Sequence, residues 1–86
     1  MTSPQLVYPC AYPLKVMGRD TAEFRAKARA IVERHVGPLI DAEVATRSSS
    51  EGNFLALTFA ITAESREQLD ALYRELSSCP EILVAL

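Results

Sequence analysis

Hydrophobic and polar residues alternate most regularly between residues 52 and 62, in the uncharged stretch Gly-Asn-Phe-Leu-Ala-Leu-Thr-Phe-Ala-Ile-Thr. Large apolar residues occupy every second position there, namely Leu55, Leu57, Phe59 and Ile61. A period of two places these side chains on one face of a β-strand, with Ala56, Thr58 and Ala60 on the other face. β-Branched and aromatic residues favour the same structure. A strand with so apolar a face predicts helices packed against that face.

The residues before this strand predict a further strand and a helix. Residues 11–17 alternate in character, and Gly18 is expected to close this first strand. A helix is predicted over residues 21–36, with Asp20 as its N-cap, because Asp20 and Glu23 have the spacing of a capping box. One apolar stripe recurs along this helix at helical spacing, consisting of Phe24, Ala28, Ile31, Val32 and His35.

The second half of the chain repeats this order. Residues 41–47 alternate weakly and predict a second strand, which a polar hairpin turn over residues 48–53 joins to the central one. A second helix is expected to begin at Glu64 or Ser65. Its apolar residues recur at helical spacing, namely Leu69, Leu72, Tyr73 and Leu76.

The last strand is predicted over residues 82–86, with Val84 and Leu86 directed toward the helices. The resulting order, βαββαβ, predicts an α+β ferredoxin-like sandwich. Right-handed crossovers give a four-stranded antiparallel sheet of order 4-1-3-2 with both helices on one face. We expect one domain over residues 10–86, preceded by a flexible lead-in over residues 1–9.

Composition excludes several classes of function. Nine Lys/Arg against eleven Asp/Glu give a net charge of -2, which argues against nucleic-acid binding. No apolar run approaches the ~20 residues of a membrane span, and the first residues lack the features of a signal peptide, so we expect a cytoplasmic protein. Cys10 and Cys79 precede strands that start at opposite ends of the predicted sheet, which predicts neither a disulfide nor a catalytic thiol.

The single histidine, His35, is the first candidate for chemistry. It falls in the last turn of the first predicted helix, where an imidazole interacts favourably with the helix dipole. A small enzyme that uses His35 with a nearby carboxylate such as Asp41 is the alternative. One histidine without a cysteine pair predicts no transition-metal site, and we expect no cofactor.

The face of the sheet away from the helices is the second candidate. It is expected to carry small and apolar side chains together with Lys15, Met17, Phe54 and Thr58. Such a face could be a dimer interface, a partner-binding face or a ligand platform. The alternative is that an N-terminal segment with Leu6, Val7 and Tyr8 covers it. The signature of RNA-binding domains with this topology is missing, since an acidic residue precedes Gly52 and Phe54 is the only aromatic residue expected on this face.

Four segments resemble the YbeD-like family of small bacterial proteins of unknown function. They are Leu14-Lys15-Val16-Met17-Gly18, Arg34-His35, Gly52-Asn53-Phe54 and the stretch from Gln68 to Leu76 with its Leu-Tyr-x-Glu-Leu. The resemblance runs from about Tyr8 to Leu86 and is weakest between Val36 and Ser50.

This resemblance implies a fold that looks like the ACT regulatory domains, which bind amino acids and control metabolic enzymes. It places a ligand near the turn after the first strand, at Gly18-Arg19-Asp20, and implies no catalytic residues. Because members are often encoded beside lipoate-attachment enzymes, it suggests partners or metabolites of lipoate or amino-acid metabolism. The first hypothesis is therefore a non-enzymatic regulatory or interaction module that binds a protein partner or a small metabolite through Lys15, Met17, Gly18, Phe54 and Thr58. An enzyme using His35 comes second, and a nucleic-acid binder third.

Overall fold

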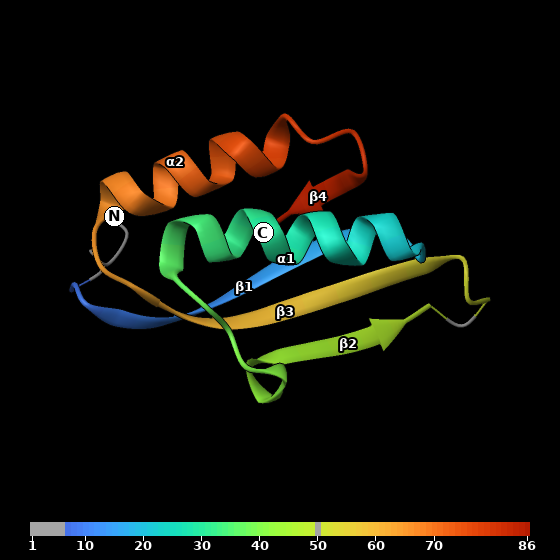
Figure 1. Cartoon of the computed structure of the whole chain (residues 1–86), viewed down its shortest axis with the longest axis horizontal. Coiled ribbons are helices and arrows are strands. Elements are labelled where there is room, and N and C mark those ends of the chain that lie inside the picture. The colour runs from blue at the N-terminus through green and yellow to red at the C-terminus, as the bar shows by residue number, and fades with distance from the viewer. Residues whose placement is uncertain (1–6, 50) are drawn as a thin grey trace, which may run out of the picture.

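The two longest strands, β1 (Cys10–Arg19) and β3 (Phe54–Ala63), lie antiparallel at the centre of a four-stranded sheet. The shorter β2 (Val44–Ser48) and β4 (Ile82–Ala85) form its edges, in the order β2-β3-β1-β4 (Figure 1). This computed structural model describes residues 7–49 and 51–86. The predicted ferredoxin-like fold and the strand order 4-1-3-2 are confirmed.

Two helices, α1 (Ala22–Val36) and α2 (Arg66–Ser77), cover one face of the sheet. In Figure 1 neither helix lies over β2. The core between the layers is built from the alternate residues of the strands and one stripe of each helix. Its largest fully buried side chains are Phe24, Phe59, Leu14, Leu55, Leu72, Leu76, Val16 and Val32. The periodicity of the sequence therefore identified the core residues of β1, β3 and the two helices correctly, but not those of β4.

Both helices begin with a side-chain cap. Thr21, and not the expected Asp20, is the N-cap of α1, and its hydroxyl accepts a hydrogen bond from the Phe24 amide at 3.0 Å. Asp20 instead pairs with Arg25 at 2.9 Å. The prediction was one residue out because both residue types cap helices well. Ser65 caps α2 as expected, accepting from the Gln68 amide at 3.1 Å.

The second strand starts later than predicted, because Asp41–Glu43 forms a 3₁₀ turn. The Glu43 carboxylate accepts a hydrogen bond from the Ile40 amide at 3.0 Å, which closes this turn locally. β2 then pairs with β3 from Val44 to Ser48. The hairpin turn therefore begins one residue later than expected, and Ser50 within it lies outside the described residues.

The register of β4 corrects the prediction for Val84 and Leu86. Val84 pairs with Met17 and Leu86 exchanges two backbone hydrogen bonds with Lys15, so both side chains lie on the face away from the helices. A β-bulge next to Met17 and Gly18 inserts one extra residue, Leu83, into β4. This insertion reverses the alternation, and a regular period of two cannot anticipate it.

β1 does not end at Gly18 but continues to Arg19. Gly18 is buried, and a Cβ atom at this position would lie 2.6 Å from the Phe24 ring and 2.6 Å from the Glu81 carbonyl oxygen. Gly18 is thus a packing residue within the strand, over which Phe24 of α1 fits.

Candidate functional site

The face of the sheet away from the helices, here called the open face, is organised in rows that run across the strands. Residues opposite one another in adjacent strands share a face and lie close together. In sheet order, the first row is Arg47, Ala56, Met17 and Val84, and the second is Ala45, Thr58, Lys15 and Leu86. Phe54 stands beside Arg19 in a third row.

Four of the predicted site residues therefore share this surface: Lys15, Met17, Phe54 and Thr58. Thr58 lies directly between Lys15 on β1 and Ala45 on β2. The fifth, Gly18, does not join them, because it is buried on the helix side beneath Phe24.

The open face carries large apolar side chains that remain accessible. Met17 is 36% exposed, Phe54 42%, Val84 43% and Leu86 62%. Of the N-terminal residues considered as a cover, Leu6 lies outside the described residues and Val7 is exposed. Tyr8 packs against the core, on the side where the helices lie. Val7 and Tyr8 therefore do not provide the cover that the alternative required.

A hollow of about 190 Å³ opens on this face above Ala56, here called the Ala56 hollow. Ala56 is small, and its larger neighbours form the walls: Met17 on β1, Arg47 on β2 and Phe54 along β3. Ser48 and Ser49 complete the rim on the β2 side. The volume exceeds the ~150 Å³ of a protein cavity that accommodates benzene. The hollow therefore has room for one large apolar side chain.

Cationic side chains also stand on the open face, and one of them contacts Phe54. The Arg19 guanidinium lies over the Phe54 ring, 5.7 Å from its centroid, which is a cation–π distance. This contact lies beside the Ala56 hollow, because the Phe54 ring forms part of its wall.

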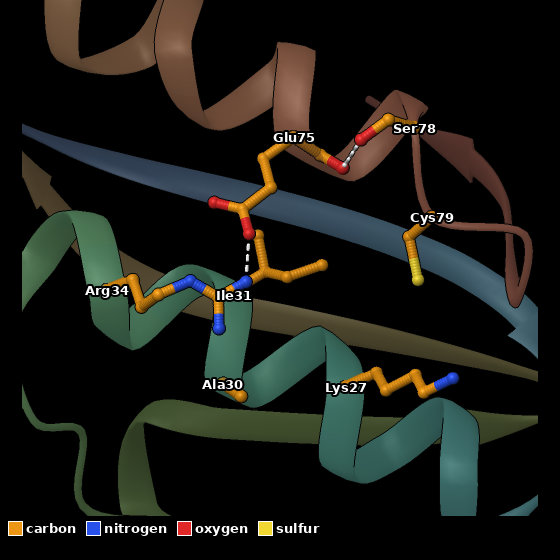
Figure 2. Close-up of a pocket in the computed structure, with 7 residues that line it drawn as sticks. All are labelled: Lys27, Ala30, Ile31, Arg34, Glu75, Ser78 and Cys79. Atoms are coloured by element: carbon orange, nitrogen blue, oxygen red, sulfur yellow. Dashed lines mark hydrogen bonds and ion pairs between the residues drawn. The ribbon is translucent and has the colours of Figure 1, made fainter.

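A second concave region, of about 310 Å³, lies between the two helices (Figure 2). Ala30 and Ile31 of α1 line it, with Lys27 at one end and Arg34 at the other. Carboxylates already neutralise both cations: Glu75 of α2 bonds Arg34, and Glu81 bonds Lys27 at 2.7 Å.

The Lys27–Glu81 pair shows in the acid–base properties of both groups. The hydrogen bond between them raises the pKa of Lys27 and lowers the pKa of Glu81. The Cys79 thiol donates a weaker hydrogen bond to the same carboxylate at 3.4 Å. The region between the helices is therefore a set of satisfied pairs that join the helices and the loop after α2.

His35 belongs to this junction. Its Nε2 lies 2.8 Å from the Glu75 carboxylate, and its backbone carbonyl accepts a hydrogen bond from Gln68 at 2.8 Å. The expected partner Asp41 does not bond to it and pairs instead with Arg29 at 2.8 Å. One Glu75 oxygen is held by His35 and the other by Arg34. His35 thus links α1 to α2, and nothing in this arrangement points to an enzyme.

The remaining candidates for chemistry add no site. Among residues 7–49 and 51–86, no group of three His, Cys, Asp or Glu side chains is placed to hold a metal ion. Cys10 and Cys79 are both free thiols. In the part of the chain that the structure describes, neither helix is long and apolar enough to cross a membrane.

Comparison with known proteins places the chain in a family. Residues 3–86 match the family described as "Protein of unknown function (DUF493)". The chain belongs to the DUF493 family. Its similarity to the YbeD-like proteins is thereby confirmed. This assignment carries no established activity.

Relatives of this DUF493 chain include proteins named UPF0250 from three bacteria. The one from Leptothrix cholodnii is 44% identical over 79 residues, which cover 92% of this chain and 87% of the relative. The one from Chromobacterium violaceum is 40% identical over 79 residues, with 92% and 89% covered. The one from Nitrosomonas europaea is 38% identical over 87 residues, with both chains covered completely.

A solved structure shares the fold. The solution structure of protein HP0495 from H. pylori superposes with a TM-score of 0.72 at 15% identity, covering 98% of this chain and 88% of that one. At this identity the likeness supports the ferredoxin-like fold and nothing about function.

Sequence reasoning missed four residues of the open face: Arg19, Arg47, Val84 and Leu86. The two apolar residues were hidden by the bulge in β4. The alternation of the strands could have identified the two arginines. Arg19 lies two residues from the outward-facing Met17, and Arg47 lies two residues from the outward-facing Ala45. Lys15, Arg19 and Arg47 are the only charged residues in the four strands.

Proposed function

We propose that this DUF493 chain is a non-enzymatic interaction module, with a regulatory role, that binds a protein partner through its open face. The observation that supports this most strongly is the group of exposed apolar side chains formed by Met17, Phe54, Val84 and Leu86. Large accessible apolar side chains gathered on one surface are typical of interaction sites. The helices cover β1 and β3 on the other face of the same sheet, so the asymmetry between the two faces needs a reason (Figure 1).

The structure of the Ala56 hollow favours a protein over a free metabolite. The hollow is open and shallow, with Ala56 at its base, and enclosed ligand pockets usually bury most of a small molecule. Protein interfaces, in contrast, use such hollows to receive a single side chain from the partner.

A cross-linking experiment in cells tests the proposal. A photoreactive phenylalanine analogue placed at Phe54 is expected to form adducts with a small number of discrete proteins. The matched control carries the analogue at Arg66 of α2, whose side chain is 81% exposed on the opposite side of the molecule. Identical adducts from both positions, or none from Phe54, would contradict the proposal.

The variant Phe54→Asp provides the second test. Phe54 is half exposed, so the substitution should cost about 1 kcal/mol or less and leave the domain folded. Binding of the cross-linked partner should be lost. Unfolding of this variant would show that Phe54 is a core residue.

An NMR titration with amino acids and lipoate-related metabolites tests the alternative that the chain binds a small ligand. Localised shifts near Gly18 would favour that alternative.

A further inference from the structure

The charged residues of the strands all lie on the open face, and all are positive. Three of the nine Lys/Arg residues stand in strands, whereas none of the eleven Asp/Glu residues does. Lys15, Arg19 and Arg47 all point to the open face, since each alternates with a buried residue or pairs with an outward-facing one. A chain whose net charge is -2 thus has one face with only positive side chains in its strands.

These three cations differ from the four cations of α1. On α1, carboxylates lie within ion-pair distance of Arg25, Lys27, Arg29 and Arg34. Across the described residues 7–49 and 51–86, no carboxylate lies within ion-pair distance of Lys15, Arg19 or Arg47. The cations of the open face are therefore available to a partner.

We infer that the open face binds an acidic protein segment in which carboxylates flank one large apolar side chain. This inference rests on the proposed function and names the chemistry of the partner. The apolar side chain enters the Ala56 hollow between Met17 and Phe54, and a carboxylate beside it reaches Arg47 on the rim. Carboxylates further along the segment pair with Lys15 and Arg19, which lie on either side of Met17 along β1, in the two neighbouring rows.

Other occupants fit this surface less well. A second copy docking face to face would bring like charges together, which disfavours such a dimer. Anionic membranes and RNA attract proteins over long distances through net positive charge, and this chain is net negative. A local match between a basic, hollowed face and an acidic segment requires no favourable net charge on the whole chain.

Selection from a displayed library of random peptides tests the inference without knowledge of the natural partner. The full chain should enrich peptides with Asp or Glu around one large apolar residue. The Phe54→Asp variant should enrich none of them. A selected peptide, synthesised and measured by fluorescence anisotropy, should bind about tenfold more weakly to Arg47→Glu, because the reversed charge repels its carboxylates. Its affinity should also fall as salt is raised.

The control is Arg66→Glu on α2, which changes the net charge by the same amount at an exposed position away from the open face. It should alter affinity less than about twofold, the level of a remote exposed charge. Equal losses in both variants would mean a general charge effect and would overturn the inference.

The remaining outcomes separate the inference from the proposed function. Peptides that depend on Phe54 but carry no acidic residues would overturn the acidic partner and leave the interaction surface standing. An absence of any Phe54-dependent peptide would count against both. Binding to phosphatidylserine vesicles or to poly(U) RNA that Arg47→Glu abolishes would replace the acidic segment with a polyanion. Self-association lost in Phe54→Asp would replace it with a second copy.

Discussion

Gly18 is closely packed, and its replacement by alanine gives a sharp test of how β1, α1 and the loop before β4 fit together. The new Cβ would lie 2.6 Å from the Glu81 carbonyl oxygen and 2.6 Å from two carbon atoms of the Phe24 ring. Gly18 does not have a positive φ angle, so its backbone conformation is open to alanine. Crowding alone therefore determines the cost.

Two opposing effects set the magnitude. At an uncrowded site, Gly→Ala stabilises by about 0.4–1 kcal/mol because it restricts the unfolded chain. Overpacking a filled core costs about 1–3 kcal/mol. One of the clashing atoms is backbone and cannot rotate away, so we expect the upper part of that range and a net loss of about 2 kcal/mol. For a domain of this size the midpoint of thermal unfolding should fall by roughly 8–16 °C.

Thermal and urea unfolding followed by circular dichroism would measure this loss. A second pair of variants isolates the ring: in a Phe24→Leu background, the further cost of Gly18→Ala should shrink by about 1 kcal/mol, because the clash with the ring is gone and that with Glu81 remains. A Gly18→Ala protein as stable as the parent would refute the packing described here. An equal cost in both backgrounds would refute the role of the Phe24 ring.

Two further predictions concern stability. Burial raises the pKa of Tyr73, and the 2.9 Å hydrogen bond to Tyr12 raises it further. The stability that Tyr73 contributes is therefore complete below the unfolded pKa of about 10 and is lost as the pH rises above that value. The urea midpoint of Tyr73→Phe should therefore fall less than that of the parent between neutral and strongly alkaline pH, and parallel curves would contradict this. Removing the N-cap with Thr21→Ala should cost about 1 kcal/mol, whereas removing the exposed pair partner with Asp20→Ala should cost about 0.5 kcal/mol or less. The reverse ranking in urea unfolding would restore Asp20 as the cap.

Periodicity predicted the fold because most of the stabilising contacts repeat along each element. The alternation in β3 and the stripes of the two helices identify which side chains are buried, and burial dictates the layers. Where two neighbouring residues suit the same role, the prediction was one residue out, as for the N-cap of α1 at Asp20 or Thr21. The 3₁₀ turn at Asp41–Glu43 was missed because its short pattern also fits a weak strand.

The candidate surface was predicted in part for the same reason. Lys15, Met17, Phe54 and Thr58 follow directly from the alternation of β1 and β3. The contribution of β4 could not be predicted, because the bulge beside Gly18 is a property of the pairing between strands and not of either strand alone. The partner of His35 was also beyond the sequence, since Glu75 reaches it only once α2 has packed beside α1.

The strand β2 contributes little to the core, which has a consequence for how this protein would misfold. Only Val44 of its five residues is partly buried, and neither helix lies over it (Figure 1). Yet β2 covers the edge of β3 from Leu55 to Phe59. The strand β3 has no charge, proline or glycine, which is the composition typical of amyloid-forming segments. A brief detachment of β2 would leave the rest of the core intact and turn this strand into an open template for other chains. Resistance to aggregation therefore depends on the least buried strand of the domain more than on its global stability.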